Sequence, residues 1–203
     1  MISHVGLVDY GISGNLFNVK KALEVAGAKV TVIQNEADFR DVQKIVLPGV
    51  GSFKNAMDSI GPIRDTLIEE LQVKPALGIC LGMQILASKG FEGGETRGLG
   101  LIDAEVKKIE IRGKVPHLGW GRVNILNDSP LFKDISSESN FYFMHSYEMI
   151  NYQNVIALTE YCDHHFVSVI QKGMIFGVQF HPEKSREAGL QLIRNFLTVQ
   201  VKP

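Results

Sequence analysis

The sequence predicts an α/β fold, with a mainly parallel central sheet flanked by helices and an antiparallel, β-rich second half. Through the first half, short apolar runs alternate with longer amphipathic ones, which is the spacing of β-α-β units. The short runs at residues 45–47 and 76–79 are apolar without interruption, as in strands that helices cover on both faces. The second half changes to closely spaced β-rich runs.

The elements of the first half follow from this alternation. We expect strands at residues 5–9, 30–33, 44–47 and 76–79. We expect helices that cross over the sheet at residues 16–25, 67–71 and 83–87. Each helix then connects two parallel strands, because parallel neighbours need a crossover connection.

The second half contains a predicted strand at residues 141–144 and a predicted hairpin within residues 166–180. Two β-rich runs flank Lys172-Gly173 in the latter segment, and this dipeptide is a turn signal. The last run, residues 183–199, has a helical pattern that predicts a packed closing helix. Its apolar residues at helical spacing are Leu190, Ile193, Phe196 and Leu197.

Length and composition indicate one domain over residues 1–203. The chain has 203 residues and a formal net charge of −1, from 21 Lys and Arg against 22 Asp and Glu. A chain of this length buries roughly 70% of the surface that its unfolded form exposes, so it can form a core without disulfides or structural metals. The near-zero charge argues against nucleic-acid binding, which needs a basic face.

Cysteine usage and hydropathy predict a soluble cytoplasmic protein. Cys80 and Cys162 are the two cysteines, whereas a secreted disulfide scaffold would use more of them at regular spacings. The N-terminus lacks the pattern of a signal peptide, and no stretch approaches the ~20 apolar residues that span a bilayer. We therefore expect a reducing compartment and no membrane partner.

The most informative local sequence is the run Gly-Ile-Cys-Leu-Gly at residues 78–82, which joins a buried strand to a helix. This is the form of a nucleophile elbow, in which flanking glycines let the strand and the helix approach closely. The helix N-terminus would stabilise the Cys80 thiolate, and the amide of Leu81 would face a developing oxyanion. A buried structural cysteine beside packing glycines is the alternative.

A candidate base for this nucleophile is His181, which stands before Pro182 and Glu183. The proline biases His181 toward extended backbone, and in that geometry residues i and i+2 project to the same side. Glu183 can then orient the imidazole while its other nitrogen faces a thiol, as in a catalytic triad. The alternative is a helix entry, with Pro182 in the first turn and Glu183 favoured by the helix dipole.

A glycine-rich segment at residues 48–53 follows a buried strand, so we expect it at the carboxyl edge of the sheet, where open α/β folds place their sites. It has neither a P-loop nor a dinucleotide-binding pattern, so no cofactor is expected. Cys162, His164 and His165 lack the spacing of zinc ligands, and no metal is expected either. His117 and His145 are interpreted as hydrogen-bonded supports.

Taken in order, these motifs resemble the triad class of glutamine amidotransferases over nearly the whole chain. The resemblance is closest to the glutaminase subunits of imidazole glycerol phosphate synthase. It is carried by residues 9–11, 14–16, 48–53, 78–84, 116–120, 141–147 and 179–183. It implies that Cys80 attacks the side-chain amide of glutamine, that His181 transfers the proton, and that Glu183 orients His181.

The resemblance also implies the other site residues. Val50 and Leu81 match the family's oxyanion amides. The residues that match positions holding the amino-acid end of glutamine are Gln84, Glu92, His145, Ser146 and Tyr147. A carboxylate at Glu92 suits an ammonium group, and the backbone amides of residues 145–147 suit a carboxylate.

The resemblance further implies a partner, because the glutaminase domain fills the chain and leaves the ammonia acceptor to a second subunit. In the resembled enzyme this is a TIM-barrel synthase in a heterodimer, and Trp120 belongs to the segment that faces it; a core position is the alternative for this tryptophan. The chain has Gly121 where the family usually has asparagine, and both Ile12 and Ser13 where it usually has one residue.

Other functions stay open at this point. Related chains pair with similar barrels to amidinate a surface-polysaccharide sugar. A thiol hydrolase, such as a peptidase or γ-glutamyl hydrolase, could use the same sheet and the same nucleophile. A silent scaffold would need a missing triad member, and the sequence retains Cys80, His181 and Glu183.

Overall fold

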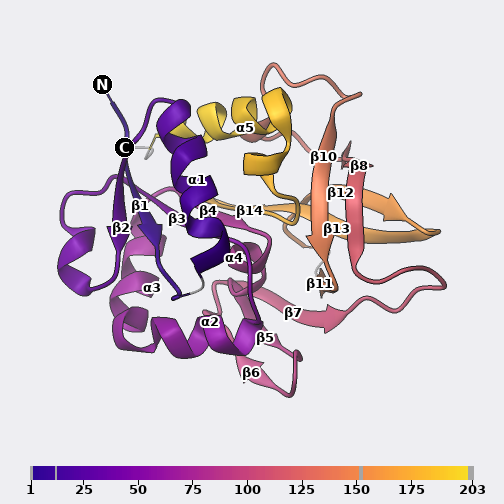
Figure 1. The fold of residues 1–203 in the computed structure, drawn as a ribbon, viewed down its shortest axis with the longest axis horizontal. Coiled ribbons are helices and arrows are strands. Elements are labelled where there is room, and N and C mark those ends of the chain that lie inside the picture. The colour runs from indigo at the N-terminus through magenta and orange to yellow at the C-terminus, as the bar shows by residue number, and fades with distance from the viewer. Residues whose placement is uncertain (1, 12, 151–152, 201–203) are drawn as a thin grey trace.

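The computed structural model describes residues 2–11, 13–150 and 153–200. Its central sheet has the strand order β2-β1-β3-β4-β14-β13-β12-β9. The part from β2 to β14 is parallel, and the part from β14 to β9 is antiparallel. The predicted α/β class, with a parallel sheet and an antiparallel second half, is therefore confirmed (Figure 1).

The parallel strands lie close to their predicted positions. They are β1 (His4–Val8), β2 (Lys29–Ile33), β3 (Lys44–Leu47), β4 (Ala76–Ile79) and β14 (Ile175–Val178). Val46 and Leu77 face one side of the sheet, while Ile45 and Ala76 face the other, so both faces are covered by core residues. This burial on both faces explains the uninterrupted apolar runs of the sequence.

The helices cover the sheet in two layers (Figure 1). One layer consists of α1 (Ser13–Val25) and α5 (Arg186–Thr198), whose apolar residues share one core cluster. The other consists of α2 (Phe53–Ile60) and α3 (Arg64–Val73), which contribute to the second cluster. No helix in the described part of the chain is long and apolar enough to cross a membrane.

The helix predicted at residues 83–87 is wrong. The structure has one helical turn, α4 (Leu81–Gln84), and then strand β5 (Ala87–Gly90). β5 joins a second sheet of order β11-β7-β5-β6, which also contains β6 (Thr96–Arg97), β7 (Ile102–Lys108) and β11 (Tyr147–Ile150). A short apolar run suits a buried helix or a buried strand, and here pairing with β7 decides for the strand.

The antiparallel region carries the predicted hairpin, formed by β13 (His164–Lys172) and β14 around Gly173. β12 (Val155–Tyr161) and β9 (Asn124–Ile125) extend the sheet to its edge. A separate pair, β8 (His117–Arg122) and β10 (Asn140–His145), accounts for the strand predicted at 141–144. The closing helix begins at Arg186, three residues later than predicted, after a 3₁₀ turn at Pro182–Lys184.

Candidate active site

Cys80 lies at the sharp turn between β4 and α4, with backbone angles of φ 48° and ψ −104°. This conformation is rare for a residue with a side chain and costs about 1–3 kcal/mol, so the surroundings must hold it. One restraint is the hydrogen bond of 2.7 Å from the Cys80 amide to the carbonyl of Val178. The predicted elbow is present, although the helix that follows it has a single turn.

The two glycines at this corner are needed because backbones pack directly against each other. A Cβ on Gly82 would lie 2.0 Å from the carbonyl oxygen of Leu47, at the end of β3. A Cβ on Gly49 would lie 2.2 Å from the carbonyl oxygen of Ile79, just before the nucleophile. The segment at residues 48–53 is thereby held against the elbow, at the carboxyl edge of the sheet as predicted.

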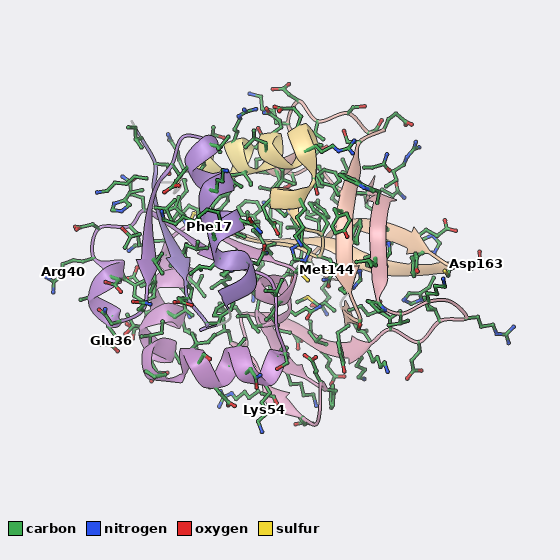
Figure 2. All side chains as sticks on the ribbon, in the orientation of Figure 1. Phe17, Glu36, Arg40, Lys54, Met144 and Asp163 are labelled. Carbon is green, nitrogen blue, oxygen red and sulfur yellow. The ribbon has the colours of Figure 1, made fainter. Side chains whose placement is uncertain are left out.

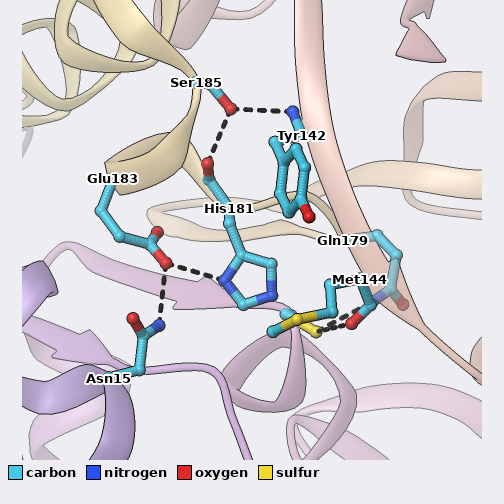
Figure 3. A network of polar contacts seen from close by, with 8 residues as sticks. Asn15, Tyr142, Met144, Gln179, His181, Glu183 and Ser185 are labelled. Atoms are coloured by element: carbon cyan, nitrogen blue, oxygen red, sulfur yellow. Dashed lines mark hydrogen bonds and ion pairs between the residues drawn. The ribbon is translucent and has the colours of Figure 1, made fainter. Parts of the chain in front are cut away.

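His181 and Glu183 form a fully buried pair. Nδ1 of His181 lies 2.8 Å from Oε1 of Glu183, and neither side chain is exposed to solvent (Figure 3). His181 has extended backbone, with φ −104° and ψ 94°, and Pro182 begins the 3₁₀ turn that brings Glu183 back beside the ring. Nε2 of His181 makes no hydrogen bond to any described residue, which leaves this nitrogen available for proton transfer.

Neighbouring strands bring the nucleophile and the imidazole together. β4 and β14 are parallel neighbours, with Ile79 in register with Val178. Cys80 directly follows Ile79, and His181 stands three positions after Val178. The convergence of Cys80 and His181 therefore depends on the register of two paired strands. Paired strands hold residues more rigidly than loops do.

The charges at the site reinforce each other. Burial alone would lower the pKa of His181, but electrostatic attraction to Cys80 and the hydrogen bond with Glu183 outweigh it and raise the pKa to about 10. Burial of Glu183 would raise its pKa, but the hydrogen bonds from His181 and Asn15 more than offset this effect and lower it. An imidazolium at neutral pH is therefore favoured beside the sulfur.

A cavity of about 280 Å³ opens beside Cys80. Its lining includes every residue that the family resemblance predicts for the oxyanion site or for substrate binding. These residues are Val50, Leu81, Gln84, Glu92, His145, Ser146 and Tyr147. These residues come from the segment at 48–53, the elbow, the loop after β5 and the junction of β10 with β11. Its volume suits a single amino acid, and its wall contains both polar and apolar residues.

Two of the lining side chains are already held by the protein. Oε2 of Glu92 accepts a hydrogen bond of 2.7 Å from the amide of Phe53, the first residue of α2. Nε2 of Gln84 donates to the carbonyl of Tyr147 at 2.9 Å and to Oε1 of Gln179 at 3.1 Å. Both N–H groups of Gln84 are used in these bonds, so a bound molecule would meet its oxygen.

Asn15 and Gln179 belong to the site although sequence reasoning gave them no role. Nδ2 of Asn15 donates to Oε1 of Glu183 at 2.8 Å, and Nε2 of Gln179 lies 3.4 Å from Sγ of Cys80 (Figure 3). The thiol itself donates to the carbonyl of Met144 at 3.8 Å. The only signal in the sequence is that Asn15 and Gln179 lie within motifs that carry the family resemblance.

His117 and Cys162 do not line the cavity, whereas His145 does. Nδ1 of His145 lies 2.9 Å from the carbonyl of Tyr147, so this ring is hydrogen-bonded as expected. His117 differs from expectation: it stacks between Phe143 and Tyr161, and its Nδ1 has no hydrogen-bond partner among the described residues. Cys162 is in the tight turn between β12 and β13 with a φ of 51°.

The described residues contain no group of three or more His, Cys, Asp or Glu side chains arranged to hold a metal ion. His164 is instead paired with Glu148, with N–O distances of 2.8 and 3.0 Å.

Trp120 is 45% exposed on β8, so the core alternative is wrong. Its ring packs edge-on against Tyr142, with centroids 5.7 Å apart, and under the guanidinium of Arg186 at 4.9 Å. Leu118, on the same strand, is 60% exposed. Of the family departures, Gly121 is on this strand, and Ile12 lies outside the described residues.

Comparison with known proteins gives one consistent result. The family profile of glutamine amidotransferase class-I matches residues 7–199. The chain is 43% identical to "Imidazole glycerol phosphate synthase subunit HisH 1" of Campylobacter jejuni over 95% of its own length and 98% of the relative. It is 42% identical to the HisH subunit of Methanocaldococcus jannaschii, with the same coverage.

A solved structure supports the fold. The structure of PurLQS from Thermotoga maritima superposes with a TM-score of 0.74, over 97% of this chain and 98% of that one. The sequences are 17% identical, so this likeness concerns the fold alone.

Proposed function

Because the chain belongs to the class-I glutamine amidotransferase family, we propose that it hydrolyses L-glutamine through a Cys80 thioester and supplies ammonia to a partner synthase. The observation that carries this proposal is the junction of an elbow cysteine with a buried His181–Glu183 pair beside a cavity of amino-acid size. A structural cysteine would need neither the backbone strain nor the imidazole. The whole chain, residues 1–203, acts as one glutaminase domain in this proposal.

The proposed reaction assigns a step to each of these residues. The Cys80 thiolate attacks the carboxamide carbon of glutamine, and the amides of Val50 and Leu81 stabilise the oxyanion of the tetrahedral intermediate. His181 gives the proton at Nε2 to the departing nitrogen, so ammonia leaves and a γ-glutamyl thioester remains. Water, deprotonated by His181, then hydrolyses the thioester to glutamate and the free thiol. Glu183 holds the imidazole through both steps.

The other cavity residues fit the amino-acid end of glutamine. The carboxylate of Glu92 pairs with the α-ammonium group, and the backbone of residues 145–147 holds the α-carboxylate. Gln84 offers its oxygen from the cavity wall. This division leaves the side-chain amide of the substrate pointing at the sulfur, where the chemistry takes place.

We further propose that the chain is the glutaminase subunit of an imidazole glycerol phosphate synthase and works in histidine biosynthesis. The names of the relatives at 42–43% identity over nearly the full length support this assignment. The partner is a cytoplasmic TIM-barrel synthase that forms a heterodimer with this chain. It uses the ammonia to convert a phosphoribulosyl-formimino aminoimidazole carboxamide ribonucleotide to imidazole glycerol phosphate and a carboxamide ribotide, a lyase step.

The direct test uses Cys80→Ala in the complex with the synthase. We expect glutamine-dependent synthesis to disappear while synthesis from added ammonium salts continues, because only ammonia release needs the thiol. Cys162→Ala is the matched control, since Cys162 is exposed in a turn, and this variant should retain both activities. Loss of both activities in Cys80→Ala would refute this division of labour.

A second experiment tests the partner and acceptor. Glutamine hydrolysis is measured for the free chain, with the synthase, and with the synthase plus its ribonucleotide ligand. We expect a weak activity that rises sharply in the last case. Acceleration only with a barrel that amidinates a sugar would assign the chain to polysaccharide synthesis. Rapid hydrolysis of peptides or γ-glutamyl conjugates by the free chain would indicate a thiol hydrolase instead.

A further inference from the structure

Gln179 connects the sulfur of Cys80 to the wall of the cavity. Its side chain is completely buried, one residue beyond the end of β14. Nε2 lies 3.4 Å from Sγ of Cys80, and Oε1 accepts a hydrogen bond of 3.1 Å from Gln84 (Figure 3 draws the contact with the sulfur). The Gln179 amide also donates to the carbonyl of Ser168 at 2.9 Å, which fixes the backbone from which the side chain extends.

The direction of these hydrogen bonds is determined by a backbone carbonyl. The carbonyl of Tyr147 can only accept, so Gln84 must present its NH₂ group to it, at 2.9 Å. The second N–H of that group then faces Gln179, which must accept the hydrogen bond with its side-chain oxygen. The NH₂ group of Gln179 is left to face the sulfur. Of the two possible orientations of a buried amide, the network allows the one that aims a donor at Cys80.

Besides the imidazolium of His181, the sulfur has two hydrogen-bond partners, which favour different protonation states. The carbonyl of Met144, 3.8 Å away, can accept a hydrogen bond from the thiol but repels a thiolate. The N–H of Gln179 can donate to sulfur, and this bond becomes stronger when the sulfur is negatively charged. Because the Gln179 side chain is buried, water cannot replace the donor if it is lost.

We propose that Gln179 is a positioning residue that holds and stabilises the Cys80 thiolate and links it, through Gln84, to the part of the cavity that receives the substrate. The inference rests on the proposed glutaminase function and adds a residue to it. Gln179 touches the nucleophile but takes no proton and forms no bond to the substrate. Its hydrogen bond to Gln84 makes the position of the sulfur depend on the residue that lies against the substrate.

The test is Gln179→Glu in a Cys162→Ala background, in which Cys80 is the remaining thiol. Glutamate keeps the shape and can still accept from Gln84, but it places a carboxylate oxygen at the sulfur. Alkylation of Cys80 by iodoacetamide is followed from pH 5 to 10 in the free chain. We expect alkylation at pH 7 to slow at least about tenfold and its pH profile to move at least about one unit higher.

Three further measurements separate positioning from general damage. Gln179→Met removes the donor without adding charge, and it should move the alkylation profile in the same direction by a smaller amount. Gln72→Glu, an exposed residue of α3, adds the same charge elsewhere and should leave the profile unchanged. In the complex, Gln179→Glu should lower kcat for glutamine hydrolysis by about tenfold or more while KM stays within about threefold.

A measurement on the unaltered chain covers the case in which the variants do not fold. The side-chain ¹⁵NH₂ resonances of Gln179 should shift with pH along the same curve as alkylation of Cys80. The inference would be overturned if the alkylation profile of Gln179→Glu matched that of the parent. It would also be overturned if the Gln179 resonances did not shift with pH along the curve of Cys80 alkylation. Neither readout requires glutamine turnover, so failure of the proposed function would be seen separately, in Cys80→Ala.

Discussion

Asn15 donates a hydrogen bond of 2.8 Å to Oε1 of Glu183, although 168 positions separate the two residues. The same oxygen accepts the hydrogen bond from His181. Asn15 is 2% exposed and lies in α1, so this contact ties the carboxylate of the site to a helix from the other end of the chain (Figure 1 labels α1, and Figure 2 labels Phe17 of the same helix). Glu183 is therefore held from two sides.

Replacing Asn15 should weaken catalysis more than binding. Asn15→Leu keeps the side-chain volume but removes the donor, so Glu183 can rotate and His181 loses its fixed orientation. We expect kcat for glutamine hydrolysis by the free chain to fall about tenfold, with little change in KM, because a hydrogen bond to a charged group contributes about 1.5–3 kcal/mol. Asn18→Leu, an exposed residue of the same helix, is the matched control and should resemble the parent.

Glu183→Gln should lower both turnover and the pKa of His181. Glu183 is one of the groups that raise this pKa to about 10, and the neutral amide removes its charge. We expect kcat to fall about a hundredfold or more, as when a triad loses its orienting carboxylate, with glutamine affinity nearly unchanged. NMR titration of the His181 ring should give a midpoint at lower pH than in the parent; equal midpoints and equal rates would remove Glu183 from the site.

His117 should make the protein sensitive to acid. Burial lowers its pKa to about 4 from an ordinary value of 6.5. Between these two values the unfolded chain binds a proton that the folded chain does not, so the free energy of unfolding must decrease as the pH falls from 6.5 to 4. The slope from this residue is at most about 1.4 kcal/mol per pH unit.

The variant His117→Phe tests this directly, because phenylalanine can keep the stack between Phe143 and Tyr161. Urea unfolding from pH 4 to 7 should show a shallower loss of stability in the variant than in the parent. His165→Phe, a substitution at an exposed histidine, should retain the parent slope. Parallel curves for His117→Phe and the parent would show that His117 is not responsible.

Trp120 should contribute strongly to binding of the synthase. A tryptophan that is 45% exposed, with Leu118 exposed on the same strand, presents a large apolar contact. We expect Trp120→Ala to weaken the complex about thirtyfold, corresponding to a loss of about 2 kcal/mol, and to leave the free chain's glutaminase activity intact. Val73→Ala, at the exposed last residue of α3, is the control, and both variants are measured by calorimetry with the purified synthase.

The sequence predicts best the parts of the fold whose causes are local. The elbow at Cys80 could be predicted because glycines must stand where backbones touch, and the extended His181 because a proline follows it. The helix predicted at residues 83–87 is wrong because a short apolar run has no period that separates helix from strand. The turn at Cys162-Asp163 was not predicted because both residues have positive φ, which Asn and Gly usually provide.

The polar contacts around the proposed triad could not be predicted from the sequence, for a different reason. Asn15 and Gln179 gain their roles from partners 168 and 99 positions away. Such contacts depend on helix packing and on strand order, which a single sequence does not specify. Resemblance to a family located the motifs that contain these residues, but the structure was needed to say what each side chain touches.

The placement of β4 between β3 and β14 has a consequence for synthesis on the ribosome. In the emerging polypeptide, β4, the strand that leads into the turn at Cys80, has an unpaired edge until residues 175–178 have been translated. The imidazole and the carboxylate arrive only after that, so a truncated or half-made product cannot release ammonia. During the same interval the unpaired edge of β4 can pair with other chains, so we expect the nascent protein to depend on chaperones at this stage.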